Sequence, residues 1–291
     1  MKSKVYFTKE ITKEAIVKMY EILNKELKGK VAIKVHSGEL GNQNFIKPEM
    51  YKDIVEKLNA TIIECNTAYE GARNTTEKHQ ELMKKHGWTN HYNVDILDSE
   101  DQDLVLEIKE GKIIKKNYVG KNLKKYDSML VISHFKGHPM GGYGGALKQL
   151  SIGVASSKGK RYIHCVGKEN GSYEDMFKVD QNNFLEAMAD SAKSVVDYFN
   201  KEIIYINIMC NMSVDCDCCA TAKDPCIKDI GILSSTDPVA IDQACIDLVY
   251  NSEDEGKIHL IERIESRNGI HTIESAEVLN IGSREYELIE I

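Results

Sequence analysis

The chain has 291 residues, of which 42% are hydrophobic and 29% charged, and its formal net charge is -7. These proportions are ordinary for a soluble globular protein with a sizeable core. The basic residues are spread along the chain, which argues against a nucleic-acid partner. The N-terminus lacks an uninterrupted apolar segment and no window approaches 18 apolar residues. We therefore expect no signal peptide, no membrane partner and a cytoplasmic location.

Short apolar runs alternate with longer helical patterns in the first third of the chain. Helical spacing of apolar residues predicts a helix near residues 11–27, and the run VAIKV predicts a buried strand over 31–35. Pro48 stands where the next helix begins. The pattern continues with a strand over 61–65, a helix near 74–86 and a short strand over 94–97.

The same alternation continues after a hairpin. Residues 104–119 alternate around Glu110-Gly111, which predicts a β-hairpin insertion. The apolar runs 129–133 and 203–210 predict buried parallel strands, and a helix is expected near 181–199. A last helix is expected over 238–250, with Asp237 as its N-cap. The sequence thus predicts a single α/β domain over residues 1–291, with a mostly parallel sheet and helices on both faces.

Polar side chains follow the predicted strands. In open parallel sheets, ligands bind beyond the carboxyl ends of the strands. His36 follows the strand at 31–35, Asn66 and Thr67 follow the strand at 61–65, and His134 follows the strand at 129–133. We expect these residues to gather at one edge of the sheet and to share a site. The alternative, that each is an ordinary polar loop residue, stays open.

A glycine-rich segment, GHPMGGYGGALKQL, spans Gly137–Leu150. Its glycines precede a short helix that carries Lys148, and free N–H groups with a nearby lysine favour an anion. The spacing matches neither a P-loop nor a dinucleotide fingerprint. The segment is either a flexible loop or a cradle for a small anionic ligand or cofactor. The expected binding residues are Gly141, Gly142, Gly144, Gly145, Lys148, Asn66 and Thr67.

One carboxylate falls on an apolar face. Within the helix predicted over 238–250, Asp242 lies between Ile246 and Val249 in angular position. Burial of a carboxylate without a partner is costly. We therefore expect Asp242 to meet a cation, a metal or several N–H groups, and the alternative is a structural ion pair or cap.

Four of the eight cysteines lie within DCDCCATAKDPC, which spans Asp215–Cys226. The spacing C-x-C-C-x6-C matches neither the bacterial ferredoxin pattern nor a zinc ribbon. In a reducing compartment, such a cluster favours metal ligation first, with a reactive or redox thiol pair, or no role, as alternatives. The other cysteines considered, Cys65, Cys165 and Cys245, are typical of small core residues.

Four segments together resemble the domain-of-unknown-function family 362, whose members are often named uncharacterised Fe–S centre proteins. They are VAIKVHSGELGN, ECNTAYEGARN, SHFKGHPMGGYGGALKQLSIG and CDCCATAKDPCIKDIGILSSTDPVAIDQACIDLV. The resemblance runs over nearly the whole chain and implies an α/β fold without an assigned reaction. Many members carry a ferredoxin-type cysteine insertion. Here the region after His164 holds only Cys165 before the helix at 181.

The segment GGYGGALKQLSIG also distantly resembles the glycine–lysine loop of lactate racemases, which hold a nickel-pincer nucleotide. That resemblance implies that Lys148 and the neighbouring histidines are candidates for cofactor contact.

Three functions fit these features. The first is a metal-dependent redox-type protein, with iron or an iron–sulfur cluster expected first and zinc second. The second is an enzyme that binds a small anionic substrate or a nucleotide-like cofactor at the glycine segment. The third is a metal-binding or delivery protein without catalysis. The candidate metal ligands are Cys216, Cys218, Cys219, Cys226, His36 and His134, and the candidate catalytic residues are His134, His138, Lys148 and Asp242.

Overall fold

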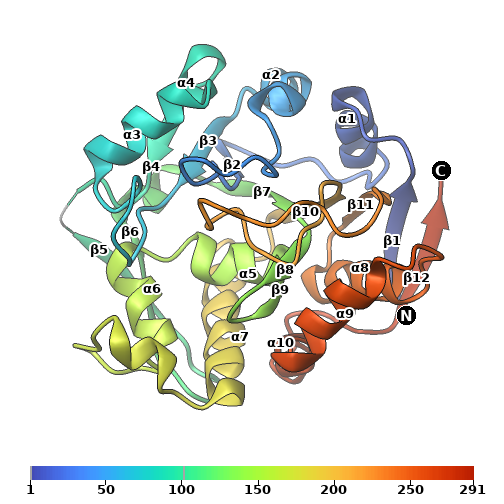
Figure 1. Ribbon diagram of the computed structural model, residues 1–291. Helices are drawn as coiled ribbons and strands as arrows, with labels where there is room; N and C mark the ends of the chain where they lie inside the picture. The colour runs from blue at the N-terminus through green and yellow to red at the C-terminus, as the bar shows by residue number, and fades with distance from the viewer. Residues whose placement is uncertain (1, 101) are drawn as a thin grey trace.

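The computed structural model describes residues 2–100 and 102–291, and its centre is one eight-stranded sheet (Figure 1). The strand order is β12-β1-β11-β10-β7-β2-β3-β4. Among these neighbours, the pairs that β11 makes with β1 and β10 are antiparallel and the others are parallel. The predicted mostly parallel sheet is therefore confirmed. The strands are β1 Ser3–Thr8, β2 Val31–Lys34, β3 Thr61–Glu64, β4 Val94–Ile96, β7 Ser128–His134, β10 Ile203–Met209, β11 Gly231–Ser235 and β12 Tyr286–Glu290.

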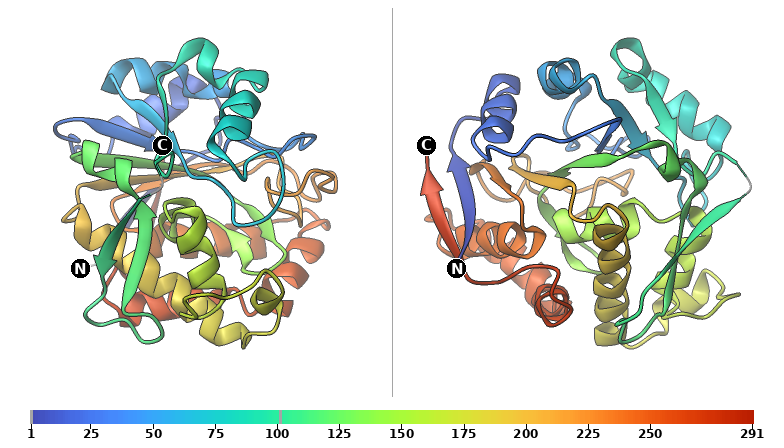
Figure 2. Two further views of the ribbon diagram at one scale, coloured as in Figure 1. Left: turned by 90° about the vertical axis from the view of Figure 1, so that its left-hand side faces the viewer. Right: turned by 180° about the vertical axis from the view of Figure 1, so that it is seen from behind.

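Helices cover both faces of the sheet, as the sequence predicted (Figure 2). One face carries α1 Lys13–Glu21, α2 Lys52–Leu58, α3 Thr76–Lys85 and α4 Trp88–His91. The other side carries α5 Ala146–Lys148, α6 Ser157–His164, α7 Gln181–Tyr198, α8 Pro238–Tyr250, α9 Lys257–Ser266 and α10 Ile270–Val278. Successive strand side chains point to opposite faces. Accordingly, Leu130 and Ile132 of β7 join the core under α1 and α2, and Met129 and Val131 join the core under α7 and α8.

The predicted hairpin is present but turns differently. Its strands are β5 Asp103–Glu107 and β6 Lys116–Gly120, with Glu107 opposite Lys116. The connection is therefore residues 108–115 instead of a tight turn at Glu110-Gly111. The cause is Asp190 of α7, whose buried carboxylate accepts the backbone N–H groups of three successive connection residues, 112–114, at 2.6–2.9 Å.

Two other segments differ from expectation. The helix predicted over 11–27 ends at Glu21, and Asn24 beyond it has a positive φ of 48°. The glycine-rich segment contains a small antiparallel pair, β8 Lys136–His138 and β9 Gly142–Gly144, before α5 and a π-helical turn over Gln149–Gly153.

The N-cap prediction holds, because Asp237 accepts the N–H groups of Val239 and Ala240. No helix in the described ranges is long and apolar enough to cross a membrane.

Candidate metal centre and adjoining cavity

The candidate site lies at the carboxyl edge of the sheet. Because β2, β3, β7 and β10 run parallel, the residues that follow them meet at one edge. His36 and His134 line one small recess there, together with Lys136 and Lys148. The loop after β10, residues 210–227, brings the cysteine cluster to the same edge.

A buried carboxylate ties the cysteine loop to the sheet. Asp217 accepts hydrogen bonds from His134 Nδ1 at 2.9 Å and pairs with Lys136 Nζ at 2.8 Å. Burial opposes its charge, but His134 and Lys136 hold the pKa of Asp217 well below its usual range. Asp217 lies between Cys216 and Cys218, so this ion pair fixes both cysteines relative to β7 and β8.

Close backbone packing completes that attachment. Gly137 donates its N–H to Ser213 O at 2.8 Å, and a Cβ at Gly137 would overlap the carbonyl of Val214.

We expect Gly137→Ala to displace the cysteine loop and to destabilise the fold by about 1–3 kcal/mol. Urea unfolding measures this, with Gly71→Ala as control, since a Cβ there meets its nearest neighbour at 3.6 Å. Equal midpoints for the two variants would contradict the proposed close packing.

Three donor groups converge at this loop. The ligand atoms of His138, Cys216 and Cys218 all lie within 4.8 Å of one another, close enough to bind a metal ion. Lys148 Nζ lies 3.7 Å from Cys216 Sγ. A hydrogen bond from Cys218, then the charge of Lys148 and a hydrogen bond with His138, lower the pKa of Cys216 well below its usual value against the effect of burial. Cys216 is therefore the thiolate of the cluster. The hydrogen bond between Cys216 and Cys218 raises the pKa of the Cys218 thiol.

This group differs from the ligand set expected from sequence. Of the six expected ligands, Cys216 and Cys218 belong to it, and His138 supplies the imidazole. Both ring nitrogens of His134 are engaged, with Asp217 at 2.9 Å and with Cys210 O at 2.6 Å. His36 lies nearby. Burial lowers its pKa, and a hydrogen bond with Cys216 acts in the opposite direction. Cys219 and Cys226 lie outside the group among the described residues.

His138 has a defined hydrogen-bonding pattern. Its Nδ1 accepts the backbone N–H groups of Met140 at 3.2 Å and Gly141 at 2.9 Å. Burial and the charge of Lys148 lower the pKa of His138 to about 4, so the ring is neutral near pH 7. A neutral imidazole carries one proton, and Nδ1 is an acceptor, so that proton is on Nε2. Metal ligation through Nε2 therefore requires Met140 and Gly141 to release Nδ1.

The first two N–H groups of α5 already have an acceptor within the chain. The carboxylate of Asp242 accepts the N–H groups of Ala146 at 2.8 Å and Leu147 at 2.9 Å. It also accepts hydrogen bonds from Asn207 Nδ2 at 2.7 Å and Tyr143 OH at 3.1 Å. Asp242 thus meets several N–H groups, as its burial required. These N–H groups serve the chain's own carboxylate instead of an external anion, and Asp242 holds α5 in place from α8.

A cavity of about 320 Å³ adjoins the three donor groups. Cys218 and His138 form part of its wall, and so do the basic side chains of Lys148, Lys160 and Arg73. Among the expected binding residues, Thr67 also lines it. Asn66 has a different role, because its side chain binds Thr76 Oγ1 at 3.0 Å and His79 Nδ1 at 3.3 Å.

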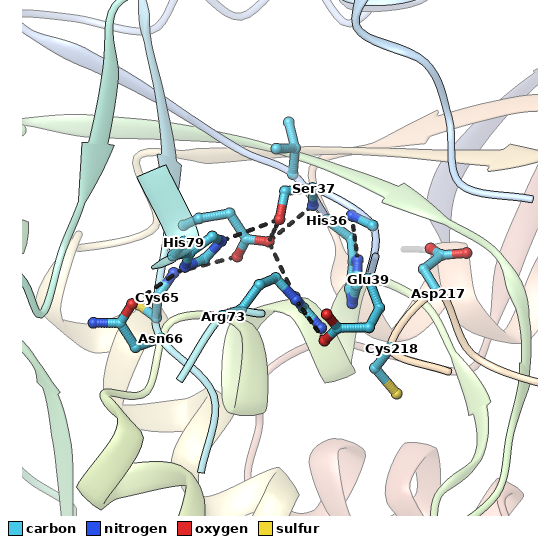
Figure 3. A network of polar contacts seen from close by, with 12 residues as sticks. His36, Ser37, Glu39, Cys65, Asn66, Arg73, His79, Asp217 and Cys218 are labelled. Atoms are coloured by element: carbon cyan, nitrogen blue, oxygen red, sulfur yellow. Dashed lines mark hydrogen bonds and ion pairs between the residues drawn. The ribbon is translucent and has the colours of Figure 1, made fainter. Parts of the chain in front are cut away.

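A buried charge network supports the cavity wall (Figure 3). Lys34 Nζ pairs with Glu64 at 2.7 Å, and Arg73 Nε pairs with Glu39 at 3.2 Å. Glu64 also accepts hydrogen bonds from the Ser37 backbone N–H at 2.9 Å and its hydroxyl at 3.0 Å. Lys34, Glu64 and Arg73 were not among the residues predicted from the sequence. A signal was present in VAIKV and TIIEC, because each apolar strand pattern contains one charged residue.

The family model of DUF362, a domain of unknown function, matches residues 31–247. The chain belongs to this family. The resemblance seen in the sequence is thereby confirmed. The range that matches DUF362 contains His36, His134, His138, the cysteine cluster and Asp242. Comparison with curated proteins gives no match.

Two solved structures show distant likeness to this DUF362 chain. The lactate racemase apoprotein from Thermoanaerobacterium thermosaccharolyticum is 16% identical, with a TM-score of 0.49 over 84% of this chain and 57% of that chain. A protein of known crystal structure from Thermotoga maritima is 12% identical, with a TM-score of 0.39 over 67% of this chain and 49% of that chain. This chain therefore spans little more than half the length of the racemase. At these values, neither protein indicates the chemistry of this one.

Proposed function

We propose that this protein is an enzyme that acts on a small anionic molecule, with one transition-metal ion held by His138, Cys216 and Cys218. The observation that supports this most is the convergence of the three donor atoms within 4.8 Å, where His138 and Cys218 also line a cavity. Two thiolates and one imidazole form a ligand set of catalytic zinc sites, which keep the fourth position open for water or substrate. An adjoining cavity favours catalysis over electron transfer or metal delivery.

The ligand set favours a single ion over a cluster. An iron–sulfur cluster ordinarily takes four protein ligands. The described residues bring two cysteines and one histidine together. Thiolate and imidazole suit zinc well, so we place zinc first and mononuclear iron second, which reverses the order expected from the family resemblance. When bound, such an ion supplies a Lewis acid.

The chain's own residues would hold and orient the substrate. Lys148 lies within 3.7 Å of Cys216 and also lines the cavity, so its ammonium can bind the anionic group beside the reaction centre. His138 is neutral near pH 7 and lies in the same wall, which suits a metal ligand. The buried Lys34–Glu64 pair forms part of the same cavity wall.

Metal content tests the proposal. We expect protein purified without oxygen to hold about one metal ion per chain by elemental analysis, since thiolates bind zinc and iron strongly. The Cys216→Ser/Cys218→Ser double variant should lose at least nine-tenths of it. Cys226→Ser is the matched control and should keep the wild-type content. Equal content in wild type and the double variant, or no metal in wild type, would refute a metal centre at these cysteines.

A second candidate function is a metal-free enzyme in which the Cys216 thiolate is the nucleophile. The tautomer of His138 favours this candidate. Because Nδ1 accepts backbone N–H groups, the ring proton is on Nε2, which can donate it to Cys216 in a hydrogen bond. Lys148 provides a second cation beside the sulfur. This arrangement fits activated cysteines, which have a cationic or hydrogen-bonding neighbour.

Alkylation separates the two candidates. Cys216 is fully buried. If its thiolate is free, we expect iodoacetamide to modify it faster than Cys65 and Cys245, which are equally buried but have raised pKa values, as peptide mass spectrometry would show. Lys148→Met should slow that modification at least several-fold because it removes the neighbouring cation. If the metal centre is correct, Cys216 should react after chelation and be protected when metal is restored.

A further inference from the structure

We infer that the cavity takes a molecule with a doubly negative oxyanion group at one end and an apolar group at the other. This inference rests on the proposed function, because it names the substrate class for the same cavity. A dicarboxylate and a phosphate monoester share the required charge. The inference is drawn for the metal centre, because in the thiolate alternative the charge of Cys216 would offset that of Lys148.

The charges of the inner wall carry the first half of the inference. Four cationic side chains line the cavity, and Lys34 and Arg73 among them are paired with Glu64 or Glu39. Within the described ranges, no carboxylate lies at ion-pair distance from Lys148 or Lys160. Lys160 is left without a balancing carboxylate, and Lys148 faces the sulfur of Cys216 alone. Because a divalent ion bound by Cys216 and Cys218 would neutralise their two thiolates, both ammonium groups then match two negative charges on a ligand.

These two lysines have donors to spare. Lys160 is 8% exposed, and its Nζ donates to Ala155 O at 2.5 Å. Lys148 Nζ contacts Cys216 Sγ. An ammonium has three donors, so both groups retain hydrogen-bonding capacity toward the cavity. Burial of a cation without a partner is costly, and a bound anion would offset that cost. Burial lowers the pKa of Lys160, against the weaker opposing effects of the Asp98 and Glu64 carboxylates.

The cavity wall also has an apolar part. Met140, Ile152, Met176, Tyr173 and Phe177 line it. Tyr173 and Phe177 are 52% and 61% exposed, although large aromatic side chains are usually more buried, and their rings meet at 5.2 Å in an edge-to-face pair. Each belongs to the short segment before α7, and each has surface left to cover. An apolar group on the ligand would gain roughly 25 cal/mol per Å² buried against them.

A matched set of small probes tests both halves by calorimetry. Phenyl phosphate and phenylsuccinate carry the dianion and the ring. Phenylacetate carries one charge, and succinate and inorganic phosphate lack the ring. We expect the two complete probes, or at least one of them, to bind tenfold or more tightly than every incomplete probe. Whichever complete probe binds identifies the source of the dianion. The inference would be overturned if phenylacetate bound as tightly as both complete probes. It would also be overturned if succinate and inorganic phosphate bound as tightly as the complete probes.

Variants assign the ends of the ligand to the walls. Lys160→Met and Lys148→Met should each weaken the complete probe at least tenfold. Phe177→Ala should reduce the difference in affinity between the complete probe and the ring-free probe of the same charge. Lys158→Met is the control, because Lys158 is on the same helix α6 but is exposed, and it should bind as wild type does. Lysine variants that melt like wild type and bind the probe unchanged would overturn the assignment.

Metal analysis of the same preparations separates this inference from the proposed function. Full metal content without probe discrimination would refute the ligand class and leave the metal centre standing. Probe discrimination in protein that holds no metal would refute the metal centre and leave the ligand class standing.

Discussion

Replacing Asp242 with alanine is expected to destabilise the fold by about 3–5 kcal/mol, the range seen when buried polar networks lose a charged member. The carboxylate is fully buried and accepts hydrogen bonds from two backbone N–H groups, one amide and one phenol. Each buried donor left without an acceptor costs about 1–3 kcal/mol. The loss should also release α5, which carries Lys148, so probe affinity should fall together with stability.

Urea unfolding and probe affinity check this prediction. Asp242→Asn is informative beside Asp242→Ala, because the amide nitrogen would face N–H donors and should not restore stability. Glu262→Ala removes an exposed acid from helix α9 and should leave the unfolding midpoint unchanged within error. A wild-type midpoint for Asp242→Asn would show that the N–H groups of Ala146 and Leu147 do not depend on this carboxylate.

The sheet was predictable because its signal is local. Side chains alternate along β7 and β10, and both strands are fully buried, so a continuous apolar run identifies each one. The parallel order then places the residues after the strands at one edge, and His36 and His134 indeed line one recess. The burial of Asp242 among donors follows in the same way from its position on an apolar helical face.

The composition of the donor group was not predictable from those patterns. His134 and His138 are four residues apart in SHFKGH, where His134 precedes the glycine-rich segment and His138 lies at its start. Their roles differ because Asp217, which lies far along the chain, engages His134 Nδ1, whereas the β8–β9 turn folds Gly141 N–H onto His138 Nδ1. Such differences arise from contacts between distant segments. The same reason explains why Arg73 gave no recognisable spacing: it meets Glu39, which is in another loop, and Glu64, which ends β3.

Replacing Glu64 with glutamine is expected to destabilise the fold by about 3–5 kcal/mol at neutral pH, because it leaves Lys34 as a buried cation. Lys34 is fully buried, its Nζ lies 2.7 Å from Glu64, and Gln149 Oε1 lies at 3.4 Å. The glutamine can still accept the Ser37 N–H, so the loss reports mainly the charge. Glu21→Gln removes an exposed partner of Lys57 and should leave stability unchanged within error.

The pH dependence gives a sharper test of the same pair. Burial opposes the charge of Glu64, but Lys34, His36, His79 and Arg73 hold its pKa well below the usual value. A carboxyl whose folded pKa is depressed contributes stability that is full above its unfolded pKa, about 4.3, and is lost as pH falls through the folded pKa. The stability difference between wild type and Glu64→Gln should therefore be constant from pH 6 to 8 and should shrink below about pH 4. Urea unfolding across this range measures it, and a difference that grows on acidification would rule out an ionised Glu64 in the folded protein.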